Sequence, residues 1–153
     1  MKIKLIPGSG EAIHIFNQIA ERVIVITNQP IVGKGLATHQ QVRALHTRID
    51  EYMTVHNAHI DHYLYCFHHK HEGCLCRKPD NKMFRQAKLL YDFKPKECWM
   101  IGDTDKDVGF GKKSKMKTGL VATGQGLEFK NCKPDYHFKD LLDAANQIKE
   151  MTK

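Results

Sequence analysis

The chain has 153 residues, a formal net charge of +7 at pH 7 and an ordinary share of hydrophobic residues, 41%. This length fits one domain with a single core. The longest apolar runs are far too short to span a membrane, so we expect no membrane partner. The positive charge would attract phosphorylated substrates, nucleic acid or an acidic partner.

Helical and strand-like patterns alternate along the chain from residue 9 onward. The helical spacing of apolar residues predicts helices over residues 9–20, 38–57, 81–90, 105–114 and 138–151. The runs between them predict strands over residues 22–26, 60–65, 98–101 and 118–122. The β-branched run 22–26 is typical of a strand buried on both faces of a parallel sheet. The alternation therefore predicts one three-layer α/β domain over residues 1–153, with a mostly parallel sheet.

Polar side chains come directly after two of the expected strands. Thr27 and Asn28 follow the first strand, and Asp103 follows the third. Parallel strands present their carboxyl ends at one edge of a sheet, where ligands bind. We therefore expect these residues to meet there with Lys78 and the loop 123–126. The hydroxyl and the amide can donate hydrogen bonds to an oxyanion, and the lysine supplies positive charge.

A carboxylate at this edge can hold a hard cation such as Mg²⁺, and Asp103 is the first candidate, with Asp107 a second. A cation, a lysine and a hydroxyl around one point favour a phosphoryl site, where catalysis is mostly positioning and charge neutralisation. For each aspartate taken singly, a helix cap or a solvated carboxylate is the better explanation.

One polar loop of eleven residues contains four potential metal ligands. They are Cys66, His68, Cys74 and Cys76. Three thiolates and one imidazole make a closed set that suits a tetrahedral structural zinc, and Gly73 lets the loop reverse. His69 and His71 are rivals of the first histidine for the fourth ligand position. We therefore expect a zinc-binding loop.

Two other interpretations of this loop stay open. Cysteine is often a small buried apolar residue, and a disulfide pair would need an oxidising compartment. Cys98 and Cys132 lie outside the loop and are expected to be free thiols. They point to a reducing interior, most simply the cytoplasm. The segment Met1 to Pro7 has no long apolar run, so we expect no secretory signal.

Taken together, these motifs resemble those of the haloacid dehalogenase-type phosphatases. Within them the match is to the D,D-heptose 1,7-bisphosphate phosphatases and the related histidinol-phosphate phosphatases. The family's second motif and its following loop resemble Thr27-Asn28-Gln29 and Gly33-Lys34-Gly35. Its third motif resembles Arg77-Lys78-Pro79, and its fourth resembles the run from Gly102 to Asp107. The zinc-loop pattern matches as well.

The resemblance implies a Rossmann-like fold without a large cap domain, in which the zinc loop is a flap on the substrate side. It implies Lys78 as the lysine that neutralises the phosphate, Arg77 as a substrate contact and Asp103 as the magnesium ligand. The implied reaction is Mg²⁺-dependent hydrolysis of a small phosphorylated sugar or histidinol phosphate. Thr104 departs from the heptose group, where a lysine commonly follows that aspartate. The short zinc-ligand spacing is more like the histidinol-phosphate members.

The chain departs from the family at its start. The family's first motif is a central strand ending in Asp-x-Asp, which supplies the nucleophile and the acid/base. Before Pro7 there is no such motif, and Asp103-Thr104-Asp105 lies in the fourth-motif context. Without that strand the sheet would fall into two half-sheets, and the segment Lys2 to Ile6 would fill the gap only in part. We therefore expect a truncated or catalytically silent relative, missing its first strand.

Two further functions remain as alternatives. One is a non-catalytic protein that binds phosphorylated ligands on the same scaffold. The other is a basic zinc module that binds nucleic acid, which the net charge favours weakly. The basic residues are not interleaved with aromatics that would form a stacking platform, so nucleic acid is possible but not favoured. The oligomeric state is not indicated by the sequence.

Overall fold

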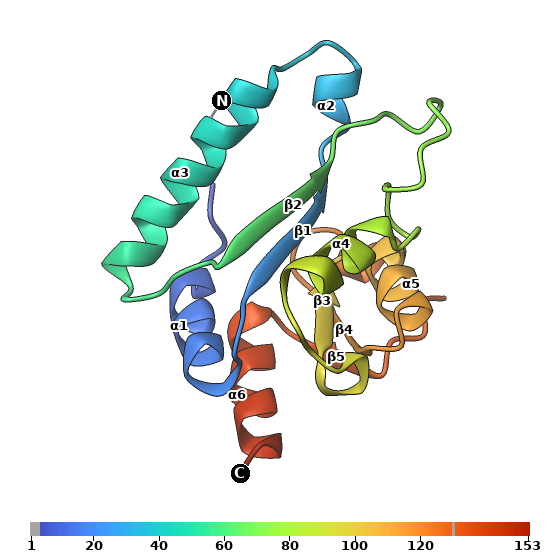
Figure 1. Ribbon diagram of the computed structural model, residues 1–153. Helices are drawn as coiled ribbons and strands as arrows, with labels where there is room; N and C mark the ends of the chain where they lie inside the picture. The colour runs from blue at the N-terminus through green and yellow to red at the C-terminus, as the bar shows by residue number, and fades with distance from the viewer. Residues whose placement is uncertain (1–3, 130) are drawn as a thin grey trace. The chain divides into compact units, whose positions relative to one another are not determined.

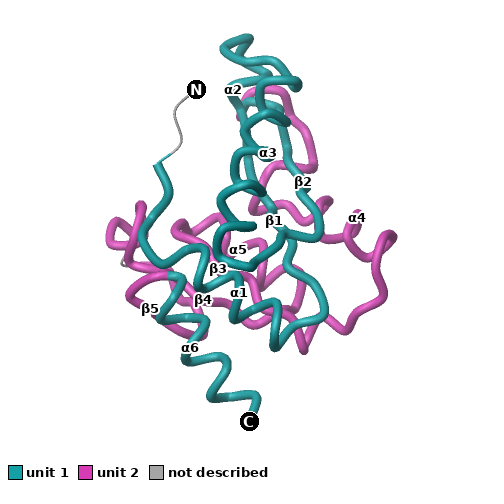
Figure 2. Tube along the Cα trace, turned by 90° about the vertical axis from the view of Figure 1, so that its left-hand side faces the viewer, with its two compact units in different colours: residues 1–69, 141–153 teal, residues 70–140 magenta. Residues whose placement is uncertain are grey.

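A computed structural model describes residues 4–129 and 131–153. The chain divides into two compact units, residues 1–69 with 141–153 and residues 70–140, called unit 1 and unit 2 below. Figure 2 colours them teal and magenta. That residues 1–153 form one domain stays a prediction. None of the helices in the described ranges combines the length and apolar character needed to cross a bilayer.

The described residues of unit 1 form four helices and two strands. They are α1 (Ser9–Ile19), β1 (Ile24–Asn28), α2 (Pro30–Gly33), α3 (His39–Val55), β2 (His62–Cys66) and α6 (Leu141–Met151). A capping box begins α3, because the Thr38 side chain accepts from the Gln41 amide while the Gln41 side chain accepts from the Thr38 amide. This box was expected from the sequence. Figure 1 shows α1 in blue beside α6 in red, and these helices are in contact.

The two strands of unit 1 pair in parallel, from Ile24 opposite His62 to Asn28 opposite Cys66. Within the described residues β1 hydrogen-bonds to no other strand, and all five of its residues are only half-buried. The expectation of a strand buried on both faces is therefore wrong for this run, because each of its residues remains partly accessible to solvent. The core of the unit lies between helices and is centred on Ile13, Met53 and Ala58.

Helix α3 packs on β2 through aromatic and polar side chains. The His46 ring stacks on the Tyr63 ring at 4.1 Å, and the Tyr63 hydroxyl donates to Asp50 Oδ1 over 2.7 Å. Burial lowers the pKa of His46, against the opposing effect of Asp50. Burial, followed by the hydrogen bond to Asp50, raises the pKa of Tyr63. Both rings therefore stay neutral in this contact near pH 7.

Unit 2 contains a three-stranded parallel sheet in the order β3-β4-β5. Its elements are α4 (Lys82–Leu90), the 3₁₀ turn Pro95–Glu97, β3 (Trp99–Gly102), α5 (Asp105–Lys113), β4 (Lys117–Val121), the 3₁₀ turn Gly126–Glu128 and β5 (Tyr136–Phe138). Helix α5 packs on β3 and β4. Gly111 makes this contact close, because a Cβ there would collide with the Thr118 side chain. Phe110 and Thr118 are fully buried in this layer.

The bounds of several predicted helices and strands need correction. Phe138, expected in the last helix, is instead the last residue of β5, and the helix begins at Leu141. A pairing with β4 overrides the local helical pattern there. The loop after β1 contains the short helix α2, which Pro30 begins. The expected strand at Lys2 to Ile6 lies partly outside the described residues, and Lys4–Ile6 form no strand.

The first prediction concerns the clamp between β4 and the segment before β5. Thr118 is fully buried, its Oγ1 donates to Asp135 Oδ2 at 3.0 Å, and it accepts from the Asp135 amide at 2.9 Å. Thr118→Val removes both hydrogen bonds at nearly constant shape. We expect it to lower the free energy of unfolding by about 1–2 kcal/mol, measured by urea denaturation.

Thr47→Val is the matched control, since its hydroxyl bonds only to the Arg43 carbonyl on an exposed face. Its expected change lies within about 0.5 kcal/mol. Equal effects of the two substitutions would contradict a structural role for the clamp.

Candidate functional site

The turn between β3 and α5 places an aspartate at the carboxyl end of the sheet in unit 2. Strand β3 ends at Gly102, Asp103 follows, and Thr104 caps α5 with its side chain accepting from the Asp107 amide. The carboxylate of Asp107 bends back and accepts from the amides of Asp103 and Thr104, each at 3.1 Å. It can approach this closely because Gly102 has no side chain, and a Cβ there would collide with Asp107 Oδ2. The turn is thus fixed on both sides of Asp103.

A buried ion pair joins this turn to the lysine of the expected third motif. Lys78 Nζ lies 2.5 Å from Asp107 Oδ1, and the two residues are 9% and 5% exposed. Buried charges of this kind are stable only when paired and hydrogen-bonded. Asp107 meets this condition, because its two oxygens accept from the lysine, from two backbone amides and from the Thr104 hydroxyl. The pair therefore fixes Lys78 next to the turn that presents Asp103.

The loop after β4 holds the carboxylate of Asp103 from the other side. Asp103 Oδ2 accepts a hydrogen bond from the Gln125 amide at 3.0 Å. Gly124 has φ 63°, and a Cβ on it would collide with the same oxygen. Only a residue without a side chain accommodates both the left-handed backbone and the close carboxylate. The expected meeting of Asp103 with the loop 123–126 is found here.

Arg77 adds an unsatisfied cationic donor to unit 2. Its Nη1 is buried and has no hydrogen-bond acceptor among the residues that the structure describes. A guanidinium normally places its N–H groups on carboxylate or phosphate oxygens. A buried, unsatisfied N–H is costly, so an anionic acceptor would improve the energetics at this position. The sequence motif had singled out the same residue.

In unit 1, Thr27 and Asn28 are the last two residues of β1 and not the residues after it. Gln29 Nε2 lies 3.4 Å from Thr27 Oγ1, and the Gln29 amide donates to the Cys66 carbonyl at 2.7 Å. The side chains of Thr27 and Asn28 are half-buried. Thr27 belongs to unit 1, whereas Lys78 and Asp103 belong to unit 2, and their gathering at one site stays a prediction.

Four side chains at the end of β2 and in the loop after it form a cluster with the geometry of a metal site. The cluster consists of Cys66, His68, Cys74 and Cys76. Their ligand atoms lie within 4.8 Å of one another, and Cys66 Sγ lies 3.6 Å from His68 Nδ1. Tetrahedral zinc with bonds of about 2.3 Å to sulfur separates its ligands by roughly 3.8 Å, so a small contraction would bring these atoms onto one ion. Gly73, at φ 67°, makes the reversal that returns the chain.

The cluster identifies which of three neighbouring histidines is placed to be the fourth metal ligand. His68 belongs to it, whereas His69 and His71 do not. None of the five cysteines forms a disulfide, so the structure does not support the disulfide interpretation. Outside the cluster, burial is the largest effect raising the pKa of the Cys98 and Cys132 thiols. These two are therefore protonated near neutral pH and poorly suited to act as nucleophiles.

Two features of the site were missed or only partly foreseen in the sequence. Asp107 was considered as a cation ligand, whereas in the structure it is the partner of Lys78. The signal was present, because Thr104-x-x-Asp107 has the spacing of a capping box. The need for glycine at positions 102 and 124 was not foreseen, since it depends on how closely two carboxylates approach the backbone.

Comparisons with known proteins agree with this geometry. Residues 75–144 match a family model described as HAD-hydrolase-like. The D-glycero-β-D-manno-heptose-1,7-bisphosphate 7-phosphatase of Pseudomonas putida is 31% identical over 121 residues, covering 79% of this chain and 69% of the relative. That of Haemophilus influenzae is 28% identical and covers 98% of this chain and 86% of the relative.

A solved structure matches over most of the chain. It is the D,D-heptose 1,7-bisphosphate phosphatase of B. bronchiseptica complexed with magnesium and phosphate, with a TM-score of 0.89 at 26% identity. The match covers 95% of this chain and 84% of that one. The ordering of helices and parallel strands, the buried lysine–aspartate pair and the sequence relatives lead to one assignment. The chain belongs to the haloacid dehalogenase-like phosphatases, the family that includes the heptose bisphosphate phosphatases.

Proposed function

We propose that the chain is built for Mg²⁺-dependent hydrolysis of a phosphomonoester on a small phosphorylated sugar. The observation that supports this most directly is the network in unit 2 that joins Lys78, Asp107 and Asp103. It fixes an ammonium group and a carboxylate at the same end of a parallel sheet. Phosphoryl transfer depends mainly on such fixed charges, because the transition state spreads negative charge over the phosphate oxygens.

Each site residue has a distinct role in this proposal. Asp103 holds Mg²⁺, since its carboxylate is half-buried and oriented by the Gln125 amide. Lys78 neutralises the phosphate, and Arg77 supplies the buried N–H that has no protein acceptor among the described residues. Thr27 and Asn28 hydrogen-bond to the transferred group. Magnesium, when bound, supplies charge stabilisation at the phosphate oxygens.

The substrate class follows from the named relatives. Two of them are heptose-1,7-bisphosphate 7-phosphatases at 31% and 28% identity. A phosphorylated sugar is therefore the first substrate to test. Histidinol phosphate is the second, because the short spacing of the zinc ligands resembles that branch.

We further propose that residues 1–153 by themselves are inactive or strongly impaired. They contain no Asp-x-Asp motif after an apolar strand near Pro7. Within the described residues, β1 pairs only with β2 and β3 pairs only with β4. Each thus has one edge where a further strand would add. Without the aspartate nucleophile, the remaining groups bind and polarise a phosphate but form no phosphoryl-enzyme bond.

The activity prediction follows from that inference. Purified residues 1–153, mixed with Mg²⁺ and D-glycero-β-D-manno-heptose 1,7-bisphosphate, should release phosphate at least about 10³-fold more slowly than the Pseudomonas putida relative, because nucleophilic catalysis is lost. The measurement is colorimetric phosphate release under matched conditions. Turnover comparable to that of the relative would refute the proposed impairment.

Binding without turnover would distinguish the non-catalytic alternative. If the same protein binds the bisphosphate in calorimetry but releases no phosphate, it acts as a phosphate-ligand binder in this form. If the protein neither binds nor hydrolyses this sugar or histidinol phosphate, the proposed substrate class is wrong.

A second proposal concerns the metal of the loop, which we assign as structural zinc held by Cys66, His68, Cys74 and Cys76. The donor set is closed, with no place for a reacting water. Cys74→Ser should reduce bound zinc from about one equivalent to near zero, measured by elemental analysis of purified protein. Cys132→Ser is the control, because this thiol lies outside the cluster and its loss should leave the zinc content unchanged.

If the unmutated protein, purified without a chelator, contains no zinc, this assignment is wrong. Retention of zinc by the Cys74 variant would instead require a different ligand set.

The magnesium proposal is tested at Asp103. Asp103→Asn keeps the shape and removes the charge, so Mg²⁺ binding should weaken at least about tenfold. Calorimetric titration with MgCl₂ in the presence of phosphate gives the measurement. Asp92→Asn is the control, as another aspartate of unit 2 without a role in this turn. An unchanged titration in the Asp103 variant would place the cation elsewhere.

A further inference from the structure

A second group of positive side chains lies in unit 2, at the amino-terminal ends of its strands. It surrounds a hollow of about 370 Å³ lined by Lys96, Lys115, Met116, Lys117, Asp135 and Tyr136. Lys117 is the first residue of β4, whereas Asp103 lies beyond the carboxyl end of β3. The length of β4, roughly 13 Å at 3.3 Å per residue, separates the two places. The hollow is therefore distinct from the candidate phosphate site.

The lysines of this hollow are not neutralised by the protein. Within residues 4–129 and 131–153, no carboxylate lies within 4.0 Å of the ammonium groups of Lys96, Lys115 or Lys117. The neighbouring Lys113, by contrast, pairs with Asp80 at 2.9 Å. An anion bound at this hollow would therefore meet three ammonium groups that have no carboxylate partner among the described residues.

The one acidic group that lines the hollow is engaged elsewhere. Asp135 Oδ2 accepts from the Thr118 amide at 2.8 Å and from the Thr118 hydroxyl at 3.0 Å. These bonds tie the carboxylate to β4. The lining therefore retains an excess of two positive charges, counting three lysines against one aspartate.

Two of the lysines are held in place by the fold. Lys115 has φ 60°, a conformation uncommon for a residue with a long side chain. Its amide donates to the Lys112 carbonyl at 3.0 Å, so the turn after α5 keeps it there. The Lys117 ammonium lies 5.6 Å from the centre of the Trp99 ring, a cation–π contact. The fold thus fixes the backbone that carries Lys115 and gives the Lys117 ammonium a contact with an aromatic ring.

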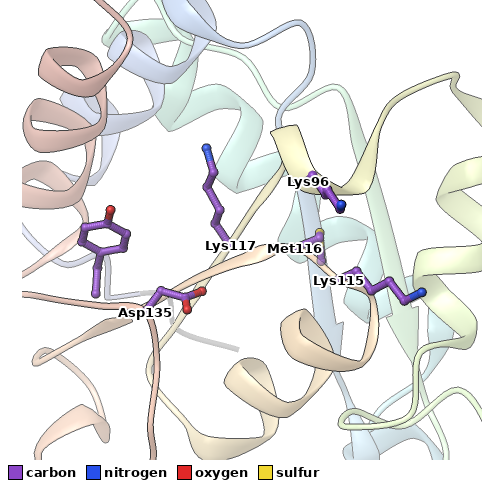
Figure 3. A pocket seen from close by; sticks show the side chains of 6 residues that line it. Lys96, Lys115, Met116, Lys117 and Asp135 are labelled. Atoms are coloured by element: carbon purple, nitrogen blue, oxygen red, sulfur yellow. The ribbon is translucent and has the colours of Figure 1, made fainter.

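Figure 3 shows how the labelled side chains lie. Lys96, Lys115 and Lys117 surround Met116, and their ends spread apart instead of meeting at one point. Separated ammonium groups match a ligand with charge at several points, such as a chain of phosphates, better than a single phosphate. We propose that this hollow binds an extended small anion carrying several phosphate groups, independently of the phosphatase site. Inorganic polyphosphate and nucleoside polyphosphates share this chemistry.

The protein contains a built-in reporter for the test. Trp99 is the only tryptophan of the chain, and Lys117 lies over its ring. Titration of residues 1–153 with tripolyphosphate at constant ionic strength should change the tryptophan fluorescence saturably, whereas equivalent chloride should not. ATP in a parallel titration separates the two sources: equal affinity assigns recognition to the phosphates alone, and tighter binding of ATP assigns a nucleoside contact as well.

Charge-removing variants locate the binding. Lys96→Gln and Lys115→Asn should each weaken tripolyphosphate binding roughly three- to fivefold, and asparagine tolerates the left-handed backbone at position 115. Lys149→Gln, on the exposed side of α6, is the matched control and should change nothing. Asp103→Asn should also leave this binding unchanged, which separates it from the phosphatase proposal.

Three results would overturn the inference. One is the absence of a saturable fluorescence change. Another is equal weakening by the Lys149 control, which would indicate diffuse charge attraction. The third is lysine-dependent binding of an oligonucleotide without binding of tripolyphosphate, which would assign the surface to a nucleic-acid backbone.

Discussion

A buried ion pair between Lys78 and Asp107 holds together the part of unit 2 that carries Asp103. Both charged groups are nearly excluded from water, at 9% and 5% exposure. Removing one partner would leave the other buried and uncompensated, at a cost of about 3–5 kcal/mol. The same aspartate accepts from the two consecutive backbone amides of the strand-to-helix turn, those of Asp103 and Thr104. The lysine, the turn and the carboxylate of Asp103 therefore behave as one rigid assembly.

This assembly depends on small residues as much as on charged ones. Gly102 lets the Asp107 carboxylate lie against the backbone, and Gly124 does the same for Asp103. The parallel order β3-β4-β5 brings the two turns to the same end of the sheet. Electrostatic catalysis requires groups that are already oriented before the substrate arrives. Here the Asp103 and Asp107 carboxylates are oriented by contacts with the backbone, and any side chain at position 102 or 124 would block these contacts.

The two ends of the same three-stranded sheet carry different kinds of positive charge. At the carboxyl end, Lys78 is paired and buried, and its charge is balanced by an aspartate. At the amino end, three lysines line an open hollow and are not balanced by ion pairs within the described residues. A balanced, buried lysine suits a reaction in which charge develops at one point. Unbalanced, exposed lysines suit the binding of an anion that brings its own charge.

The sequence alone determined the alternation of helices and strands, because the periods of 3.6 and 2 are properties of local patterns. It also predicted a metal-binding loop, because three cysteines and several histidines within eleven residues can reach one ion once the loop reverses. It selected Arg77, Lys78 and Asp103 through motifs that place them at the ends of elements. It gave the wrong boundary at Phe138, where pairing with β4 outweighs a local helical pattern.

Only the tertiary structure decided which residues act on one another. Asp107 became the partner of Lys78 because the packing of α5 brings together residues twenty-nine positions apart. His68 was selected over two neighbouring histidines by the path of the loop. The lysine hollow joins the turns before β3, β4 and β5 and has no motif in the sequence. These features depend on long-range contacts, and local patterns do not encode which distant segments will become neighbours.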